Sequence, residues 1–469
     1  MTQEYDVVVL GGGTAGENAA WYAIDNGMTA VVVEQELVGG ECTFWACMPS
    51  KALLRPGEVL AAVRRVPGAE PAVTGSVDVG RTLRSRDSFA EEWDDKHQVE
   101  WLEDVGGELV RGRGRLAGER TVEVTQEDGT SVTLRARKAV IVATGSSPLL
   151  PPIDGLRETR VWGNRAVTSL KEVPRSLLVL GGGAVGVEIA QAWRWLGVEQ
   201  VTIVELFDRL LAREEPFAGR QLRQRFEAIG IAVLTGARVI KVHRDRDDTP
   251  VVATLEDGRQ LSADEILVAV GRDPNTRDIG LETVGLQGGG PLETDDQLHA
   301  KGVTGGWLYA VGDVNGKALF THQGKYQARL VGDIIAGQQR EDWADVHAVP
   351  RVVFTDPQVA AVGLTEQQAR EEGLEPRILQ VDLTSAAGGK LLGKDVTGTA
   401  QLVVDPARRV VVGATFTGPG VGELLHAATI AIVSEVSLDR LWHAVPAFPT
   451  VSEVWLRLLE ADRSAVSPS

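Results

Sequence analysis

The chain has 469 residues, of which 43% are hydrophobic and 24% charged, the profile of a folded protein with two to four domains. It carries 65 acidic and 48 basic residues, which give a net charge of −17. This balance argues against nucleic acid or an anionic membrane surface as a partner, because both are bound through basic patches.

No apolar stretch approaches the roughly 18 residues of a membrane span, and the first predicted strand follows the N-terminus without a signal peptide. We therefore expect a cytoplasmic protein that does not enter a membrane. Cys42 and Cys47 are the only cysteines. Two cysteines exclude a disulfide-stapled scaffold and leave too few soft ligands for a structural zinc site, so we expect no metal.

A predicted strand over residues 5–10 runs directly into a Gly-x-Gly-x-x-Gly turn, and the next predicted strand ends at Glu34. Gly11 permits the tight turn, Gly13 lets a pyrophosphate approach the backbone, and Gly16 lets the following helix pack close to the strand. The alternative is an ordinary glycine-rich turn. The flanking strands and the acid, which can hold a ribose hydroxyl, favour a dinucleotide site.

The same unit recurs about 170 residues later. A predicted strand over residues 176–180 precedes Gly181, Gly183 and Gly186, and the next strand ends at Glu205. Two such sites in one chain indicate a flavin nucleotide and a nicotinamide nucleotide. The acid at the second site favours NAD over NADP, because it accepts from a free 2′-hydroxyl and repels a 2′-phosphate.

The two cysteines lie on a predicted loop that enters a helix, directly after the first nucleotide unit. One helical turn at this spacing could bring the sulfur atoms of Cys42 and Cys47 within bonding distance. The alternative is a pair of unpaired, buried cysteines that act as small hydrophobes. A thiolate near the start of a helix has a lowered pKa and is reactive, so the position favours a redox role.

These motifs resemble those of the flavoprotein disulfide reductases, the family of dihydrolipoamide dehydrogenase, glutathione reductase and mercuric reductase. Residues 39–51 are similar to the family's redox motif, Gly-Gly-x-Cys-x-Asn-x-Gly-Cys-x-Pro-Ser-Lys. Further segments resemble family motifs in the same order along the chain: 143–148, 271–275, 310–313, 319–322, 353–357 and 362–366.

The resemblance implies an α/β protein with two Rossmann-like dinucleotide-binding domains and a C-terminal α+β dimerisation domain. The FAD-binding domain would be discontinuous, with its first part at residues 1–150 and its second part at 271–340. The NAD(P)-binding domain would span 151–270 and the dimerisation (interface) domain 345–469. A homodimer is implied, because the family builds each active site from two chains.

The resemblance also assigns roles. Electrons would pass from NAD(P)H, with NADH favoured, to FAD, then to the Cys42–Cys47 disulfide and on to an acceptor. Cys42 would be the interchange thiol and Cys47 the charge-transfer thiol beside the flavin. Lys51 would lie near the flavin ring and pair with Glu188. The expected cofactor-binding residues are Gly11, Gly13, Gly16, Glu34, Gly40, Lys51, Thr144, Gly145, Ser146, Asp313, Leu319, Phe320, Thr321 and His322 for FAD, and Gly181, Gly183, Gly186, Glu205 and Gly271 at or beside the nicotinamide domain.

The sequence departs from the family pattern at the substrate side. The family supplies a His-Pro-Thr-x-Ser-Glu segment from the partner subunit, in which the histidine is the acid–base group. Here Phe448 occupies the histidine position and Glu453 keeps the glutamate position, while His443 lies five residues out of register. In the redox motif, Phe44 and Ala46 replace Asn and Gly. We expect both phenylalanines to border the substrate side of the disulfide.

The missing histidine bears on the acceptor. Deprotonating a dithiol needs a base worth about 10²–10⁴ in rate, whereas handing electrons to a quinone does not. We therefore expect a weak dihydrolipoamide dehydrogenase whose acceptor is a small-molecule disulfide, dithiol or quinone-type compound. The alternatives are an NAD(P)H:quinone reductase in which the disulfide is a relay or idle, and a redox-sensing flavoprotein without turnover. The chain also lacks the additional C-terminal cysteine pair used by mercuric reductases.

Overall fold

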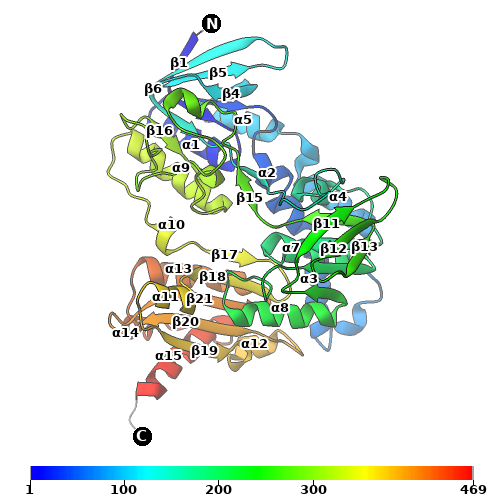
Figure 1. Cartoon of the computed structure of the whole chain (residues 1–469). Coiled ribbons are helices and arrows are strands. Elements are labelled where there is room, and N and C mark those ends of the chain that lie inside the picture. The colour runs from blue at the N-terminus through cyan, green and yellow to red at the C-terminus, as the bar shows by residue number, and fades with distance from the viewer. Residues whose placement is uncertain (1, 467–469) are drawn as a thin grey trace. The chain divides into compact units, whose positions relative to one another are not determined.

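The computed structural model describes residues 2–466 and divides into two compact units (Figure 1). Unit 1 comprises Met1–Pro49, Arg86–Leu149 and Gly271–Val346, and unit 2 comprises Ser50–Ser85, Leu150–Val270 and His347–Ser469. No helix within residues 2–466 is both long and apolar enough to span a membrane.

Unit 1 is built on a seven-stranded sheet in the order β3-β2-β1-β6-β5-β4, with β16 paired to β6. The strands β3, β2, β1, β6 and β16 run parallel, whereas β5 and β4 are added antiparallel. A two-stranded ribbon, β7–β15, accompanies the sheet. The bounds are β1 Thr2–Leu10, β2 Ala30–Glu34, β3 Glu108–Arg111, β4 Arg113–Leu116, β5 Thr121–Thr125, β6 Ser131–Val142, β7 Ser146–Pro148, β15 Arg272–Pro274 and β16 Leu308–Ala310.

The apolar run in β1 explains why this strand is central. Val7 and Val9 pack into a core with helices α1 and α9, while Val8 and Leu10 pack into a second core on the opposite face. A parallel strand covered on both faces needs such an uninterrupted apolar run. The helices associated with unit 1 are α1 Thr14–Asp25, α2 Gly40–Phe44, α5 Lys96–Asp104 and α9 Thr321–Ile335, with short 3₁₀ turns η2 Glu91–Trp93, η3 Leu281–Val284 and η4 Gly312–Asn315. Helices α3 Cys47–Arg65, α4 Val79–Phe89 and α10 Ala344–His347 include residues of both units.

The first part of unit 2 repeats the strand–turn–helix–strand arrangement. Its four-stranded parallel sheet has the order β10-β9-β8-β14, and a separate antiparallel sheet has the order β11-β12-β13. The predicted strand over residues 176–180 is confirmed as β8, and Trp193 of α7 is fully buried in the core beside it. The bounds are η1 Glu70–Ala72, α6 Asn164–Ser169, β8 Ser176–Leu180, α7 Ala184–Trp195, β9 Gln200–Val204, α8 Pro216–Ala228, β10 Ile231–Leu234, β11 Val239–His243, β12 Val251–Leu255, β13 Gln260–Ala263 and β14 Glu265–Val268.

The C-terminal part of unit 2 is a five-stranded antiparallel sheet in the order β17-β18-β21-β20-β19. Helices α13 and α15 bury apolar side chains against it, in a core around Phe416 and Leu458. The bounds are β17 Arg351–Val353, β18 Gln358–Gly363, α11 Glu366–Glu371, β19 Arg377–Asp382, η5 Leu383–Ser385, α12 Ala387–Leu391, β20 Thr399–Asp405, β21 Val410–Gly418, η6 Val421–Leu424, α13 Leu425–Val433, α14 Leu438–Leu441, η7 Val451–Glu453 and α15 Val454–Val466.

Candidate functional site

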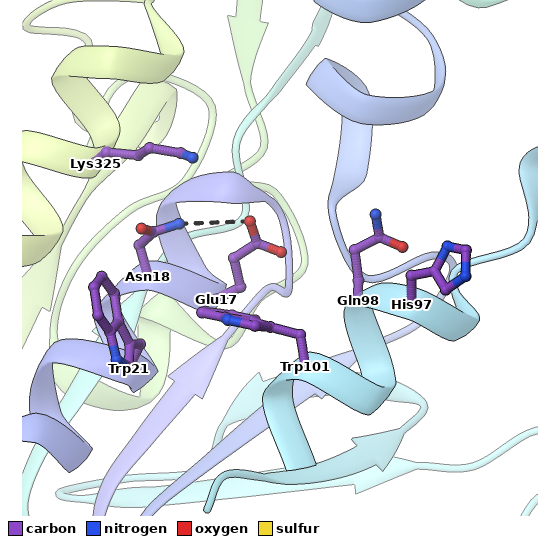
Figure 2. Close-up of a pocket in the computed structure, with 7 residues that line it drawn as sticks. All are labelled: Glu17, Asn18, Trp21, His97, Gln98, Trp101 and Lys325. Atoms are coloured by element: carbon purple, nitrogen blue, oxygen red, sulfur yellow. Dashed lines mark hydrogen bonds between the residues drawn. The ribbon is translucent and has the colours of Figure 1, made fainter. Parts of the chain in front are cut away.

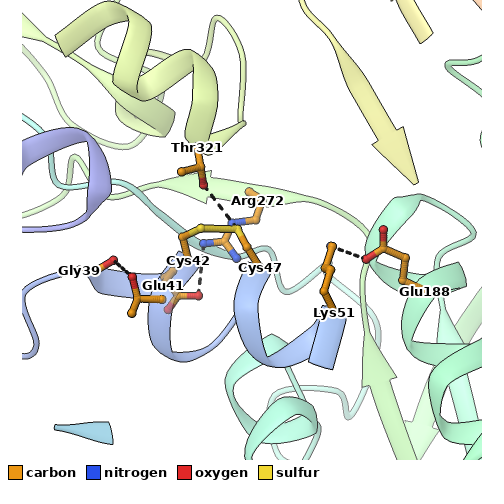
Figure 3. The surroundings of a disulfide bond; sticks show 9 residues. Gly39, Glu41, Cys42, Cys47, Lys51, Glu188, Arg272 and Thr321 are labelled. Carbon is orange, nitrogen blue, oxygen red and sulfur yellow. Dashed lines mark hydrogen bonds and ion pairs between the residues drawn. A yellow bond between two sulfur atoms is a disulfide. The ribbon is translucent and has the colours of Figure 1, made fainter. Parts of the chain in front are cut away.

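The two cysteines form a disulfide at the start of helix α3. Cys42 lies in the short helix α2, Cys47 is the first residue of α3, and their Cα atoms are 4.7 Å apart. This excludes the alternative of two unpaired cysteines. Thr321, the first residue of α9, places its hydroxyl 3.4 Å from Cys47 Sγ (Figure 3). The disulfide is therefore bordered on one side by a hydroxyl that can donate to a thiolate.

A charged cluster lies beside the disulfide in unit 1. Glu41 precedes Cys42 and pairs with Arg272, whose Nη2 lies 3.7 Å from Glu41 Oε2 (Figure 3). Arg272 Nε donates to Ser146 Oγ at 2.8 Å, and Ser146 Oγ in turn donates to Asp313 Oδ2 at 2.5 Å. Burial raises the pKa of Asp313, an effect opposed by the Ser146 hydrogen bond and by Arg272.

Sequence reasoning proposed Ser146 and Asp313 but assigned no role to Glu41 or Arg272. The signal was present. A carboxylate stands next to a redox cysteine, and an arginine stands in a motif that the chain places after the second nucleotide unit. Only the fold shows that these opposite charges meet.

The first glycine turn has the shape that a pyrophosphate requires. Gly11 adopts a φ of +107°, and a Cβ there would collide with the carbonyl oxygen of Ala143. A Cβ at Gly16 would collide with the Gly11 carbonyl, whereas a Cβ at Gly13 would meet nothing within 4 Å. The turn is thus tightly packed on its inner side and open at Gly13, at the N-terminus of α1, where backbone N–H groups attract phosphate.

The acid at the end of the second strand closes this turn. Glu34 Oε2 accepts from the Gly12 N–H and Oε1 from the Glu36 N–H, both at 2.7 Å. These bonds fix the carboxylate at the mouth of the turn, and each oxygen retains a lone pair for a ribose hydroxyl. The residues present therefore fit a dinucleotide.

The second turn repeats this geometry in unit 2. Gly181 also has a φ of +107°, and a Cβ at Gly186 would collide with the Gly181 carbonyl. A Cβ at Gly183 would meet nothing within 4 Å. The Glu205 carboxylate accepts from the Gly182 N–H and, at 2.7 Å, from the Phe207 N–H. This site therefore fits a second dinucleotide equally well.

Arg209, the first arginine after the second acid in the sequence, has partners of its own. Arg209 Nη2 donates to the Ala212 carbonyl at 2.8 Å, and Nη1 lies 3.4 Å from Asp208 Oδ1. Glu205, which directly follows β9, is 6% exposed. A carboxylate held at this position can accept a hydrogen bond from a free ribose 2′-hydroxyl.

Lys51 and Glu188 form an ion pair within unit 2. Lys51 Nζ lies 2.7 Å from Glu188 Oε2, as the resemblance implied, and also lies 5.0 Å from the centroid of the Phe354 ring (Figure 3). Glu188 Oε1 accepts from the Phe354 N–H at 2.8 Å. A buried carboxylate with both oxygens bonded holds the ammonium group in one position.

Segments 144–147 and 271–275 of unit 1 are joined through the β7–β15 ribbon. The Thr144 hydroxyl donates to the Asn275 carbonyl at 2.7 Å, and the Asn275 amide donates to the Thr144 carbonyl at 2.9 Å. Gly145 and Gly271 both have positive φ values, of 68° and 148°. The structure thus brings four of the predicted cofactor-binding positions, including Ser146, into one connected segment pair.

The remaining predicted positions of unit 1 lie at helix starts. A Cβ at Gly40 would lie 2.8 Å from Gly13 Cα, so helix α2, which carries Cys42, begins in contact with the first glycine turn. Phe320 and His322 stack with ring centroids 5.3 Å apart at the start of α9, and the preceding Leu319 is partly exposed.

The expectation that Phe44 borders the substrate side of the disulfide is wrong. Phe44 is 0% exposed, and its ring packs towards the backbone of Gly39 and lies 5.7 Å from the Trp45 ring. Phe44, the last residue of α2, is the residue of this short helix that faces the interior of unit 1, where burial of its ring is favourable. The aromatic ring at this position is therefore a core residue.

The C-terminal segment presents Phe448 to solvent in unit 2. Phe448 is 78% exposed, and His443 is also exposed. Glu453 is only 5% exposed, and among residues 2–466 its Oε2 has no hydrogen-bond partner. A buried carboxylate oxygen without a donor is unusual, because such an atom costs about 1–3 kcal/mol in lost solvation.

Two family models match the chain. The model of the pyridine nucleotide-disulphide oxidoreductases covers residues 5–330, and the dimerisation-domain model of the same family covers residues 349–458. The chain belongs to the pyridine nucleotide-disulphide oxidoreductase family. Members of this family use FAD and NAD(P)H, and its dimerisation domain supports a homodimer. The predicted fold class is confirmed by these matches.

Individual relatives of this oxidoreductase carry different names. The chain is 30% identical to mercuric reductase of Staphylococcus aureus over 96% of its own length and 81% of the relative's. It is 33% identical to dihydrolipoyl dehydrogenase of Chlorobaculum tepidum over 97% and 96% of the two lengths. Among solved structures, LpdA from Mycobacterium tuberculosis is 26% identical, with a TM-score of 0.85 over 98% of this chain and 99% of that one.

Proposed function

We propose that this oxidoreductase passes electrons from NADH through bound FAD and the Cys42–Cys47 disulfide to a small apolar or aromatic acceptor or to an unusual disulfide. The observation that supports this proposal most strongly is the disulfide at the start of α3. The same chain has two glycine turns, each with free space at the N-terminus of the following helix for a dinucleotide. Residues 1–150 and 271–340 would hold FAD, residues 151–270 the nicotinamide nucleotide, and residues 345–469 would form the dimer.

When bound, FAD supplies the two-electron relay between the nicotinamide nucleotide and the disulfide. The chain's own residues would hold and orient the parts of this nucleotide. The open turn at Gly13 would take the pyrophosphate, Glu34 a ribose hydroxyl, and Asp313 the ribityl chain, whose hydroxyls can donate to a carboxylate. Lys51, fixed by Glu188, would place a positive charge beside the ring system.

The sulfur atoms of Cys42 and Cys47 have different surroundings, and we assign them different roles. Reduction of the disulfide consumes two electrons and one proton, and leaves one thiol and one thiolate. Cys47 is the better thiolate, because it is the first residue of the 19-residue helix α3 and has the Thr321 hydroxyl 3.4 Å away. Cys42 would keep the proton and meet the acceptor.

The proposed class of acceptor follows from the absence of the family's acid–base histidine, whose position Phe448 occupies. In the homodimer, the segment around Phe448 would serve the partner subunit's disulfide, with an aromatic ring where the family has an acid–base group.

The second candidate is a quinone-type reductase in which the disulfide is idle, and the exposed Phe448 ring favours it as well. Steady-state turnover of the FAD-loaded dimer with NADH should be compared for aliphatic disulfides, aromatic disulfides and quinones. Preference for charged aliphatic disulfides would contradict the proposal.

The open space at Gly183 makes a specific prediction for the nicotinamide site. Gly183→Ala adds a methyl group that touches no protein atom within 4 Å, so we expect normal folding. The methyl group would occupy the approach of the pyrophosphate. We expect kcat/KM for NADH to fall by about 10²-fold, the order of loss caused by displacing a reactant by about 1 Å.

Gly68→Ala is the matched control, because a Cβ there also meets nothing within 4 Å and Gly68 lies in neither turn. It should leave kcat/KM unchanged. Gly13→Ala should instead reduce the FAD content of the purified protein. Wild-type kinetics for Gly183→Ala would show that the second turn does not bind the nucleotide as proposed.

A further inference from the structure

A cavity of about 360 Å³ lies in unit 1 and contains none of the residues proposed above (Figure 2). Its principal walls are Glu17 and Trp21 of α1, Gln98 and Trp101 of α5, and Lys325 of α9. We call it the indole pocket. Three helices that are distant in sequence therefore contribute aromatic, acidic, amide and basic side chains to one space.

The Glu17 carboxylate, in the wall of the indole pocket, has an oxygen that lacks a donor. Glu17 is 9% exposed, and within residues 2–466 its Oε2 has no hydrogen-bond partner, while Oε1 receives only a 3.5 Å contact from Asn18 Nδ2. Gln98 Oε1 is likewise buried without a donor in that range. The amide cannot simply be turned over, because Gln98 Nε2 donates to Glu91 Oε1 at 2.8 Å. An unsatisfied, buried carboxylate oxygen in the wall of a cavity indicates a ligand that brings a donor.

The aromatic walls indicate the charge of that ligand. The Trp21 and Trp101 rings have centroids 6.1 Å apart with an interplanar angle of 68°. In Figure 2 the Trp101 ring lies beneath the Glu17 carboxylate, so an indole face and a carboxylate border the same space. Indole faces attract cations. Lys325 reaches the cavity from α9 but forms no ion pair within 4.0 Å among the described residues.

We propose that the indole pocket binds a small organic cation that carries at least one N–H donor, of the ammonium or amidinium class. The donor would reach Glu17 Oε2, and the apolar part of the ligand would lie on Trp101. The site is one of binding only, with no covalent or redox step. It does not depend on the identity of the electron acceptor.

The charges that face Glu17 set the pH dependence of binding. Burial raises the pKa of Glu17 to about 7, and Lys325 on α9 opposes this effect. On the α5 side, His97 lines the cavity and pairs with Glu91 at 3.0 Å. A bound cation stabilises the ionised carboxylate, so binding releases a proton near neutral pH. Affinity should therefore rise as the pH increases from 6 to 8.

The test uses benzamidinium chloride, a flat amidinium with N–H donors, titrated calorimetrically into the FAD-loaded dimer at pH 8. We expect saturable binding with one site per chain, and no such binding of tetramethylammonium, which has no donors, or of benzoate. Glu17→Gln keeps the shape and removes the charge. It should weaken binding by at least about tenfold, the loss expected for one charged hydrogen bond.

Lys325→Met is the second variant, on an exposed position of α9. It removes a competing cation and should tighten binding, whether or not Glu17→Gln folds. The melting temperature and FAD content of each variant check the fold. Absence of saturable benzamidinium binding, equal affinity for benzoate, equal affinity at pH 6 and pH 8, or an unchanged affinity in folded Glu17→Gln would each overturn the proposal.

Discussion

Replacing Phe448 with histidine is expected to raise turnover with dihydrolipoamide and NAD by about 10²–10⁴-fold, the usual contribution of a positioned acid–base group. The site retains what an imidazole needs, because Glu453 is buried and its Oε2 has no partner among residues 2–466. That oxygen would accept a hydrogen bond from the new ring and orient it. The measurement is kcat with dihydrolipoamide at pH 8, beside the wild-type dimer.

Phe448→Leu is the matched control for the loss of the aromatic ring and should show no gain. The double variant Phe448→His/Glu453→Gln should gain less than the single one, because the amide cannot stabilise an imidazolium. If Phe448→His folds, binds FAD and dimerises normally but gains no dithiol activity, the absence of the histidine does not limit dithiol turnover in this protein.

Replacing either cysteine should reduce turnover with disulfide acceptors by about 10⁴-fold or more, the order of loss when a reacting nucleophile is removed. The two variants should differ in colour. Cys42→Ser leaves the Cys47 sulfur at the start of α3, with the Thr321 hydroxyl 3.4 Å from it. We expect Cys42→Ser to show a long-wavelength charge-transfer band without reductant, and Cys47→Ser to show none.

Cys42→Ala serves as the control for any effect of the serine hydroxyl and should behave like Cys42→Ser. Near-wild-type disulfide turnover in both single-cysteine variants would remove the disulfide from the electron path. A charge-transfer band in Cys47→Ser but not in Cys42→Ser would exchange the roles proposed for the two sulfur atoms.

The parts of the fold that depend on local pattern were predictable. The runs of apolar residues before Gly11 and Gly181 must be buried on both faces, and the glycine spacing allows only a tight turn into a helix. The structure accordingly has β1–α1–β2 and β8–α7–β9 at these places. The Lys51–Glu188 contact, 137 positions apart, followed only from the family resemblance.

The features that depend on three-dimensional packing were not predictable. The motif position of Phe44 predicts that its ring borders the substrate side of the disulfide. The direction of its side chain is instead set by packing against Gly39. The Glu41–Arg272 pair and the indole pocket are each formed by segments that lie far apart in the sequence. No sequence pattern links these segments, so their contact could not be predicted. Whether Glu453 Oε2 has a partner among residues 2–466 depends on side chains that the fold brings around it.

The most direct test of the proposed electron path is an anaerobic titration of the FAD-loaded protein with NADH, followed by its visible spectrum. If the Cys42–Cys47 disulfide accepts electrons, a long-wavelength charge-transfer band will appear, and the protein will take up two reducing equivalents per flavin before the flavin is fully bleached. Direct bleaching of the flavin without that band would contradict the account, and would show that the disulfide takes no part in the reaction.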